Sequence, residues 1–157
     1  MSECGIYRYA LWRDTGALGG EGTVVFVMLN PSTADAEQDD PTIRRCIRFA
    51  RDWGFARLAV GNVYALRSTD PAALARAEDP VGPKNDYWLL RLGGAVVIAA
   101  WGASRHLTTE REREVIDLLT YGGSLSLGCL GQTKNLRPRH PLFVRADVRP
   151  LPFRRRP

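Results

Sequence analysis

Apolar residues along this chain gather in short runs that are separated by polar turns. The most continuous run, residues 23–29, is rich in β-branched side chains, which is typical of a strand covered on both faces. Residues 6–13 instead alternate between apolar and polar, and they predict a half-exposed edge strand. Further apolar runs predict strands over residues 57–63, 95–100, 124–130 and 142–144.

Other apolar residues recur at helical spacing. The clearest helix follows Asp40, which suits the N-cap, and begins with Pro41, which suits the first helical position; Gly54 is placed to end it. Its basic residues fall largely off the apolar stripe: Arg44, Arg45, Arg48 and Arg51. Further helices are expected over residues 70–77, 83–92 and about 108–122.

This alternation of strands and helices predicts an α/β fold. We expect one domain, residues 1–157, with three layers: a short, mainly parallel four-stranded sheet, helices on both of its faces, and an N-terminal antiparallel edge strand. Ligands of such sheets bind beyond the carboxyl ends of the strands, so the groups that follow each strand should converge. Those groups are residues 30–32, residues 62–64, Trp101 with Gly102, and the loop of residues 134–140.

Charge and cysteine content narrow the functional classes. The net charge of +5 comes mostly from arginine, which binds phosphate through a planar fork, so it favours a polyanionic partner. The three cysteines are odd in number and widely spaced, which argues against a disulfide framework, and they form no CxxC pair, which argues against a zinc or iron–sulfur site. We expect Cys46 and Cys129 to be buried. No apolar run is long enough to span a membrane, and the N-terminus lacks a secretion signal, so a cytoplasmic location is expected.

An acidic cluster precedes the first helix and has three possible roles. Asp40 can cap the helix, Asp35 or Asp39 could act as a general base, and the cluster with Glu37 could bind a divalent metal. No second acidic cluster follows another predicted strand, so a two-metal site has little support.

Two asparagines at predicted strand ends are candidate functional groups. A carboxamide can hold a water or pair with a nucleobase edge, but Asn30 and Asn62 could equally satisfy the backbone of their own turns. Tyr64 could stack on a base or lie in the core. Ser32 could bind phosphate or stabilise the turn, and Arg67 could bind phosphate or pair with an acid.

The loop of residues 131–141 is the segment richest in candidate chemistry. Its cations are Lys134, Arg137 and Arg139, and its prolines restrict the backbone around His140. An imidazole held there can donate a hydrogen bond to a developing anion, although a solvated histidine is the alternative.

In their order along the chain, these motifs resemble those of the uracil-DNA glycosylase superfamily. The resemblance covers the turn of residues 29–32, Asn62, Trp101 with Gly102, and His140 with Pro141. The chain departs from that pattern at Met28, where the superfamily has glycine, and at residues 142–143, where it has Ser-Pro. The chain is also similar, over nearly its whole length, to a bacterial domain family of unknown function marked by the turn Leu-Asn-Pro-Ser-Thr-Ala-Asp, here residues 29–35.

The glycosylase resemblance implies removal of a damaged or modified DNA base by water attack at C1′, a reaction that needs no metal and no organic cofactor. Asn30 would position the water, and His140 would stabilise charge on the departing base. The residues in contact with the base would be Pro31, Ser32, Asn62 and Tyr64. The residues in contact with phosphates would be Arg67, Lys134, Arg137 and Arg139. Leu142 or Phe143 would act as a wedge that fills the space left by the base in the stack. The alternatives are a non-catalytic nucleic-acid or nucleotide-binding module, an enzyme acting on a small nucleotide or base derivative, and a metal-dependent phosphoesterase.

Overall fold

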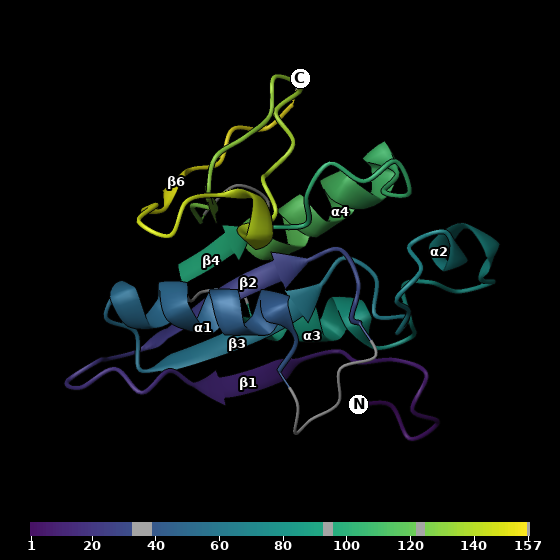
Figure 1. Cartoon of the computed structure of the whole chain (residues 1–157). Helices are drawn as coiled ribbons and strands as arrows, with labels where there is room; N and C mark the ends of the chain where they lie inside the picture. Colours follow the sequence, from purple (N-terminus) through teal and green to yellow (C-terminus); the bar gives the residue numbers. More distant parts are fainter. Residues whose placement is uncertain (33–38, 93–95, 122–124, 157) are drawn as a thin grey trace.

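A computed structural model describes residues 1–32, 39–92, 96–121 and 125–156. The chain folds as an α/β protein around a six-stranded mixed sheet with the strand order β1-β3-β2-β4-β5-β6 (Figure 1). The strands are β1 (Leu11–Asp14), β2 (Thr23–Met28), β3 (Arg57–Asn62), β4 (Val96–Ala99), β5 (Gly128–Cys129) and β6 (Leu151–Pro152). The helices are α1 (Pro41–Asp52), α2 (Ala73–Arg76), α3 (Asn85–Leu92), α4 (Thr109–Thr120) and a 3-10 turn, η2 (Pro141–Phe143).

The four middle strands of the sheet are parallel, and both edge strands are antiparallel to their neighbours. The predicted N-terminal edge strand is confirmed: β1 pairs antiparallel with β3, although it begins at Leu11 rather than at residue 6. The second edge strand, β6, is antiparallel to β5 and was not predicted. It has two residues, one of them proline, and too short an apolar run to be recognised. The sheet is therefore mixed.

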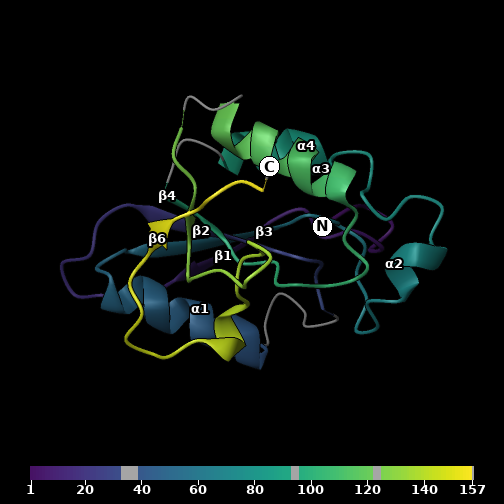
Figure 2. The same cartoon turned by 90° about the horizontal axis from the view of Figure 1, so that it is seen from above.

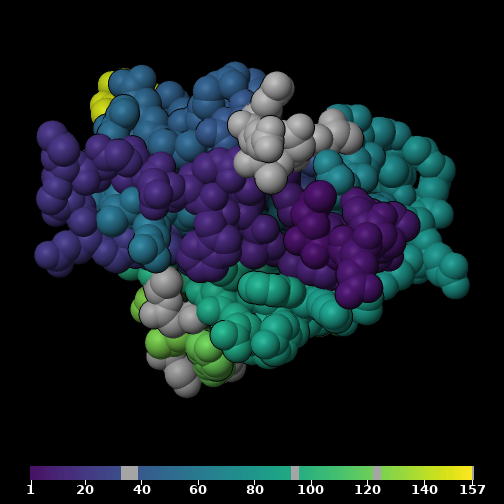
Figure 3. Space-filling model, turned by 90° about the horizontal axis from the view of Figure 1, so that it is seen from below, coloured from purple at the N-terminus to yellow at the C-terminus, as the bar shows by residue number. Residues whose placement is uncertain are grey.

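Alternate side chains of β2 bury against different helices. Val24 and Phe26 pack in a cluster with the apolar side of α1, whereas Val25 and Val27 pack in a second cluster with α3 and α4. Seen from above, α1 lies on one side of the sheet, and α3 and α4 lie together on the other (Figure 2). Seen from below, the N-terminal residues run across the surface between these two sides (Figure 3).

Two predicted strands differ from the observed structure. Residues 142–144 were expected to be a strand, but Pro141 starts the 3-10 turn η2, because His140 caps the turn with its ring nitrogen. Among the described residues of the predicted strand over 124–130, which are residues 125–130, only Gly128 and Cys129 form the ladder of β5. Cys46 and Cys129 are buried as expected, and burial raises the pKa of both thiols. In the described part of the chain, no helix has the length and apolarity needed to cross a membrane.

Candidate functional site

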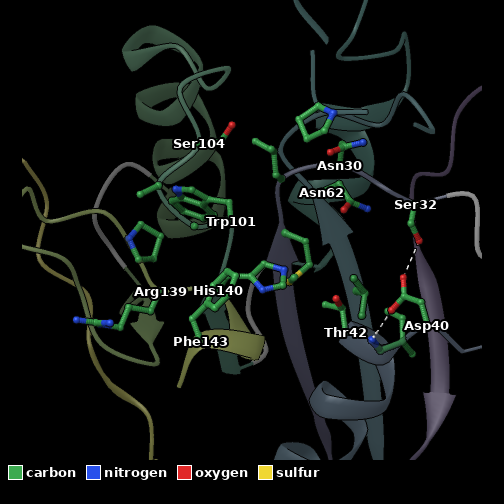
Figure 4. Close-up of a pocket in the computed structure, with 18 of the residues that line it drawn as sticks. Asn30, Ser32, Asp40, Thr42, Asn62, Trp101, Ser104, Arg139, His140 and Phe143 are labelled. Atoms are coloured by element: carbon green, nitrogen blue, oxygen red, sulfur yellow. Dashed lines mark hydrogen bonds between the residues drawn. The ribbon is translucent and has the colours of Figure 1, made fainter. Parts of the chain in front are cut away.

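The carboxyl ends of the parallel strands surround a cavity of about 680 Å³ (Figure 4). Its lining includes Asn30 after β2, Asn62 at the end of β3, Trp101 after β4, and His140 from the loop before η2. The prediction that these four segments converge is confirmed. The site is therefore assembled from positions that are far apart in the sequence, as expected of an α/β sheet.

Asn30 closes the turn after β2 with its amide group. Its Nδ2 lies 2.9 Å from the carbonyl oxygen of Ser68, 3.2 Å from that of Pro31 and 3.5 Å from that of Leu66. The amide therefore ties this turn to the loop that follows β3. Within the described residues its Oδ1 accepts no hydrogen bond, which leaves an acceptor at the cavity wall.

Asn62 is the most unusual group of the site. Only 2% of the residue is exposed, and it lines the cavity, yet its side chain makes no hydrogen bond with any residue that the structure describes. Its amide nitrogen and oxygen are not among the side-chain atoms that are sealed from solvent without a partner, so they face the open space of the cavity. A donor and an acceptor are thus held ready at the base of the cavity, close to Asn30 (Figure 4).

His140 points its ring into the cavity from the opposite wall (Figure 4). Its Nδ1 accepts a hydrogen bond from the backbone N–H of Leu142 at 3.3 Å, so a neutral ring carries its proton on Nε2. Burial lowers the pKa of the imidazole, while the charge of Asp40 acts in the opposite direction. At neutral pH the ring is therefore an uncharged donor.

Asp40 places a carboxylate at the edge of the cavity. One oxygen accepts the backbone N–H of Ile43 at 2.8 Å and caps α1, as predicted, and the other accepts the hydroxyl of Ser32 at 2.6 Å. Ser32 therefore lies in the site through its bond to this cap. The two bonds fix the carboxylate in one orientation.

A buried carboxylate supports the wall that carries Trp101 and the histidine loop. Glu112 is 3% exposed; it accepts the indole N–H of Trp101 at 2.9 Å and forms an ion pair with Arg137 at 3.1 Å. Arg156 lies 3.9 Å from the same carboxylate. Arg137, expected to bind phosphate, is thus paired with this buried carboxylate and lies outside the cavity lining.

Several other predicted site residues lie outside the cavity lining. Tyr64 is buried in the core, so it offers no stacking face to a ligand there. Pro31 is buried in the turn, and Arg67 donates to the carbonyl of Gly5. Lys134 and Leu142 are exposed outside the lining, whereas Arg139 and Phe143 border the cavity, with the guanidinium of Arg139 pointing outward (Figure 4).

The structure adds lining residues that the sequence did not single out. Arg8 is 5% exposed and belongs to the segment before β1, which the alternating pattern marked only as an edge strand. Burial and the neighbouring Arg67 lower the pKa of its guanidinium. Thr42 and Ser104 also line the cavity. Serine and threonine are common in loops and helix caps, so their positions in the sequence did not indicate a role in a site.

The acidic cluster is only partly described. Asp35 and Glu37, like Thr33 and Ala34 of the marker turn, lie outside the described residues. Asp39 forms an ion pair with Arg13 at 2.8 Å. Where side chains are described, no three His, Cys, Asp or Glu residues are grouped so that they could share a metal ion.

Comparison with known proteins places this chain in a family. The family described as "Protein of unknown function (DUF1643)" matches residues 8–142. The chain belongs to this family. The match spans β1 through the first residues of η2, and so includes the cavity residues from Arg8 to His140. No curated protein and no solved structure matches the chain, so the resemblance to uracil-DNA glycosylases rests on the motifs alone.

Proposed function

We propose that the cavity receives a damaged or modified nucleobase of DNA and that the protein hydrolyses the bond joining that base to its sugar. The observation that carries this proposal is Asn62, a buried carboxamide without a partner among the described residues, in one cavity with Asn30 and a neutral His140. A planar heterocycle with a donor next to an acceptor is the ligand chemistry that satisfies such an amide.

In this mechanism each side chain has a separate role. Asn62 pairs with the edge of the base, and the Oδ1 of Asn30 orients a water toward C1′ of the sugar. The C1′–N bond breaks with its electron pair moving to the base, while the water oxygen bonds to C1′ and its second proton goes to the base or to solvent. His140 donates from Nε2 to the anion that develops on the base; one such donor contributes about 3 kcal/mol.

The surroundings of the cavity fit a base that is extruded from a strand. Phe143 is 78% exposed at the cavity edge, where an aromatic side chain can replace the base in its stack. Extrusion costs a few kcal/mol, which a damaged or mismatched base reduces. The proposal includes a three-layer, glycosylase-like arrangement of the helices on the two sides of the sheet, and a cytoplasmic location.

A second candidate is hydrolysis of a free nucleoside or nucleotide in the same cavity. Its volume of about 680 Å³ favours this alternative, because pockets that enclose whole small molecules span about 300–1,000 Å³.

Both candidates are tested with one panel of substrates. The protein is incubated with single-stranded and duplex oligonucleotides that carry modified bases, and alkali then cleaves any abasic site; free nucleosides and nucleotides are followed by chromatography of the released base. We expect release from at least one oligonucleotide, and its loss in Asn30→Ala and His140→Ala. Asn135→Ala, at an exposed amide of the same loop, should retain activity. Release only from free nucleosides or nucleotides would favour the second candidate, and release from neither class would refute both.

A further inference from the structure

The excess positive charge of this chain lies in two segments that adjoin each other. Helix α1 and residues 139–149 together contain seven arginines and two aspartates, a net charge of +5. The whole chain, with 22 basic and 17 acidic residues, also has a net charge of +5. The rest of the chain is therefore balanced, and the charge is not a uniformly spread surface property.

Hydrogen bonds hold these two segments side by side. The guanidinium of Arg45 donates to the carbonyl of Val144 at 2.7 Å, and the indole of Trp53 donates to the carbonyl of Val148 at 3.0 Å. Arg149 donates to the carbonyl of Asp52 at 3.2 Å. Figures 1 and 2 show this C-terminal segment running along α1. We call the exposed side of α1 together with residues 139–149 the arginine face.

Three arginines form a row on the exposed side of α1. Arg44, Arg48 and Arg51 lie opposite the buried side chains of the helix, and about half of the side chain is exposed for Arg48 (57%) and Arg51 (52%). Both approach one carboxylate, Asp52, at 3.6 and 3.8 Å. Surface pairs of this kind are worth about 0–1 kcal/mol, so they leave the row available to another anion.

The two acids before α1 that the structure describes are held by other groups. Asp39 pairs with Arg13, and Asp40 is bound to the helix cap and to Ser32. The arginine face also reaches the cavity, because Arg139, His140 and Phe143 belong to both the face and the cavity lining. A polyanion on the face would therefore pass directly over the opening.

We infer that the arginine face is the docking surface for the phosphate backbone of duplex DNA beside the extruded base. The choice of partner rests on the proposed function. The row from Arg44 to Arg51 spans about 10 Å at 1.5 Å per residue, which matches about three phosphates of one strand at 3.4 Å along the duplex axis. Arginine forks bind such phosphates in a bidentate manner.

The test measures binding of a labelled, unmodified DNA duplex by fluorescence anisotropy over a series of salt concentrations. The double variant Arg48→Gln, Arg51→Gln removes two charges from the row. Each lost phosphate contact lowers the slope of log K against log salt by about 0.9, so we expect the slope to decrease in magnitude by about 1.8. The matched control Arg57→Gln, Arg76→Gln removes the same charge from two exposed arginines outside the face and should keep the slope of the unaltered protein.

Equal slopes in both double variants would overturn the inference, as would tighter binding of duplex RNA or of anionic lipid vesicles than of DNA. Because the probe carries no modified base, this result is independent of base release. A changed slope with no base released from any substrate would retain the docking surface and refute the hydrolysis. Base release together with an unchanged slope would retain the hydrolysis and refute the docking surface.

Discussion

At the scale of single residues, two buried asparagines at the same end of the sheet differ in their hydrogen bonding. Asn85 donates from Nδ2 to the carbonyls of residues 62 and 63 at 3.0 and 3.1 Å, so it stabilises the end of β3. Asn62 makes no such bond with its side chain among the described residues. The amide of Asn85 therefore stabilises the fold, whereas the amide of Asn62 is available to a ligand.

We therefore predict opposite effects of one substitution at these two positions. Asn62→Leu keeps the volume and removes an amide that lacks an internal partner, so the free energy of unfolding should stay within about 0.5 kcal/mol of the original or increase. Asn85→Leu removes the donor to two backbone carbonyls and should lower the free energy of unfolding by about 1–3 kcal/mol. Urea unfolding of both variants measures this, and equal destabilisation would assign Asn62 a structural role instead.

The pKa of His140 predicts a pH dependence of stability. Because burial lowers this pKa in the folded protein, the unfolded chain binds a proton first as the pH falls below about 6.5. The contribution of the neutral ring to stability is complete above that pH and decreases as the pH falls toward the folded pKa. Urea unfolding from about pH 7.5 to about pH 5.5 should show this loss in the original protein. His140→Gln should show a weaker dependence, and an unchanged dependence would contradict the assignment.

At the scale of elements, the start of α1 depends on the Asp40 cap. Asp40→Ala removes the acceptor for the N–H of Ile43 and for the hydroxyl of Ser32, and should lower the free energy of unfolding by about 1–2 kcal/mol. Asparagine caps helices about as well, so Asp40→Asn should recover most of that loss. Thermal unfolding compares the two, and equal losses would show that charge, rather than the cap, stabilises this turn.

Elements were predictable where one pattern dominated. The apolar run of β2 and the cap, proline and apolar stripe of α1 define these elements without reference to the rest of the chain. β5 and β6 have two residues each and exist only because they pair with neighbours. Residues 142–144 had a strand-like composition, but the capping ring of His140 favours a 3-10 turn.

The site was predictable to a similar degree. The rule that ligands bind at strand ends brought Asn30, Asn62 and His140 to one cavity. It could not distinguish Tyr64, which follows the same strand as Asn62 yet packs in the core, because turn geometry decides which side chain faces a cavity. Arg8 could not be predicted as a lining residue, because nothing in an alternating segment indicates which of its polar residues will be buried at the sheet edge.

At the scale of the whole molecule, Glu112 links the cavity wall to the C-terminal segment. It contacts Trp101, Arg137 and Arg156, which come from three parts of the chain. Glu112→Gln keeps an acceptor for the indole but leaves Arg137 without its buried counter-charge, and should cost about 3 kcal/mol of unfolding free energy. Glu110→Gln, at an exposed position in the first turn of the same helix, is the control and should cost less than about 0.5 kcal/mol. Similar losses in both variants would refute a special role for this carboxylate.

The seven arginines of α1 and its neighbouring segment give this side of the molecule a positive electric field. A polyanion at a distance would feel a torque as well as an attraction, and the protein would rotate during diffusion until the cavity side faces its partner. Productive collisions would then be a larger fraction of all collisions, and this gain would vanish once salt shortens the Debye length to a few ångströms. Correct orientation would thus begin before the two surfaces touch.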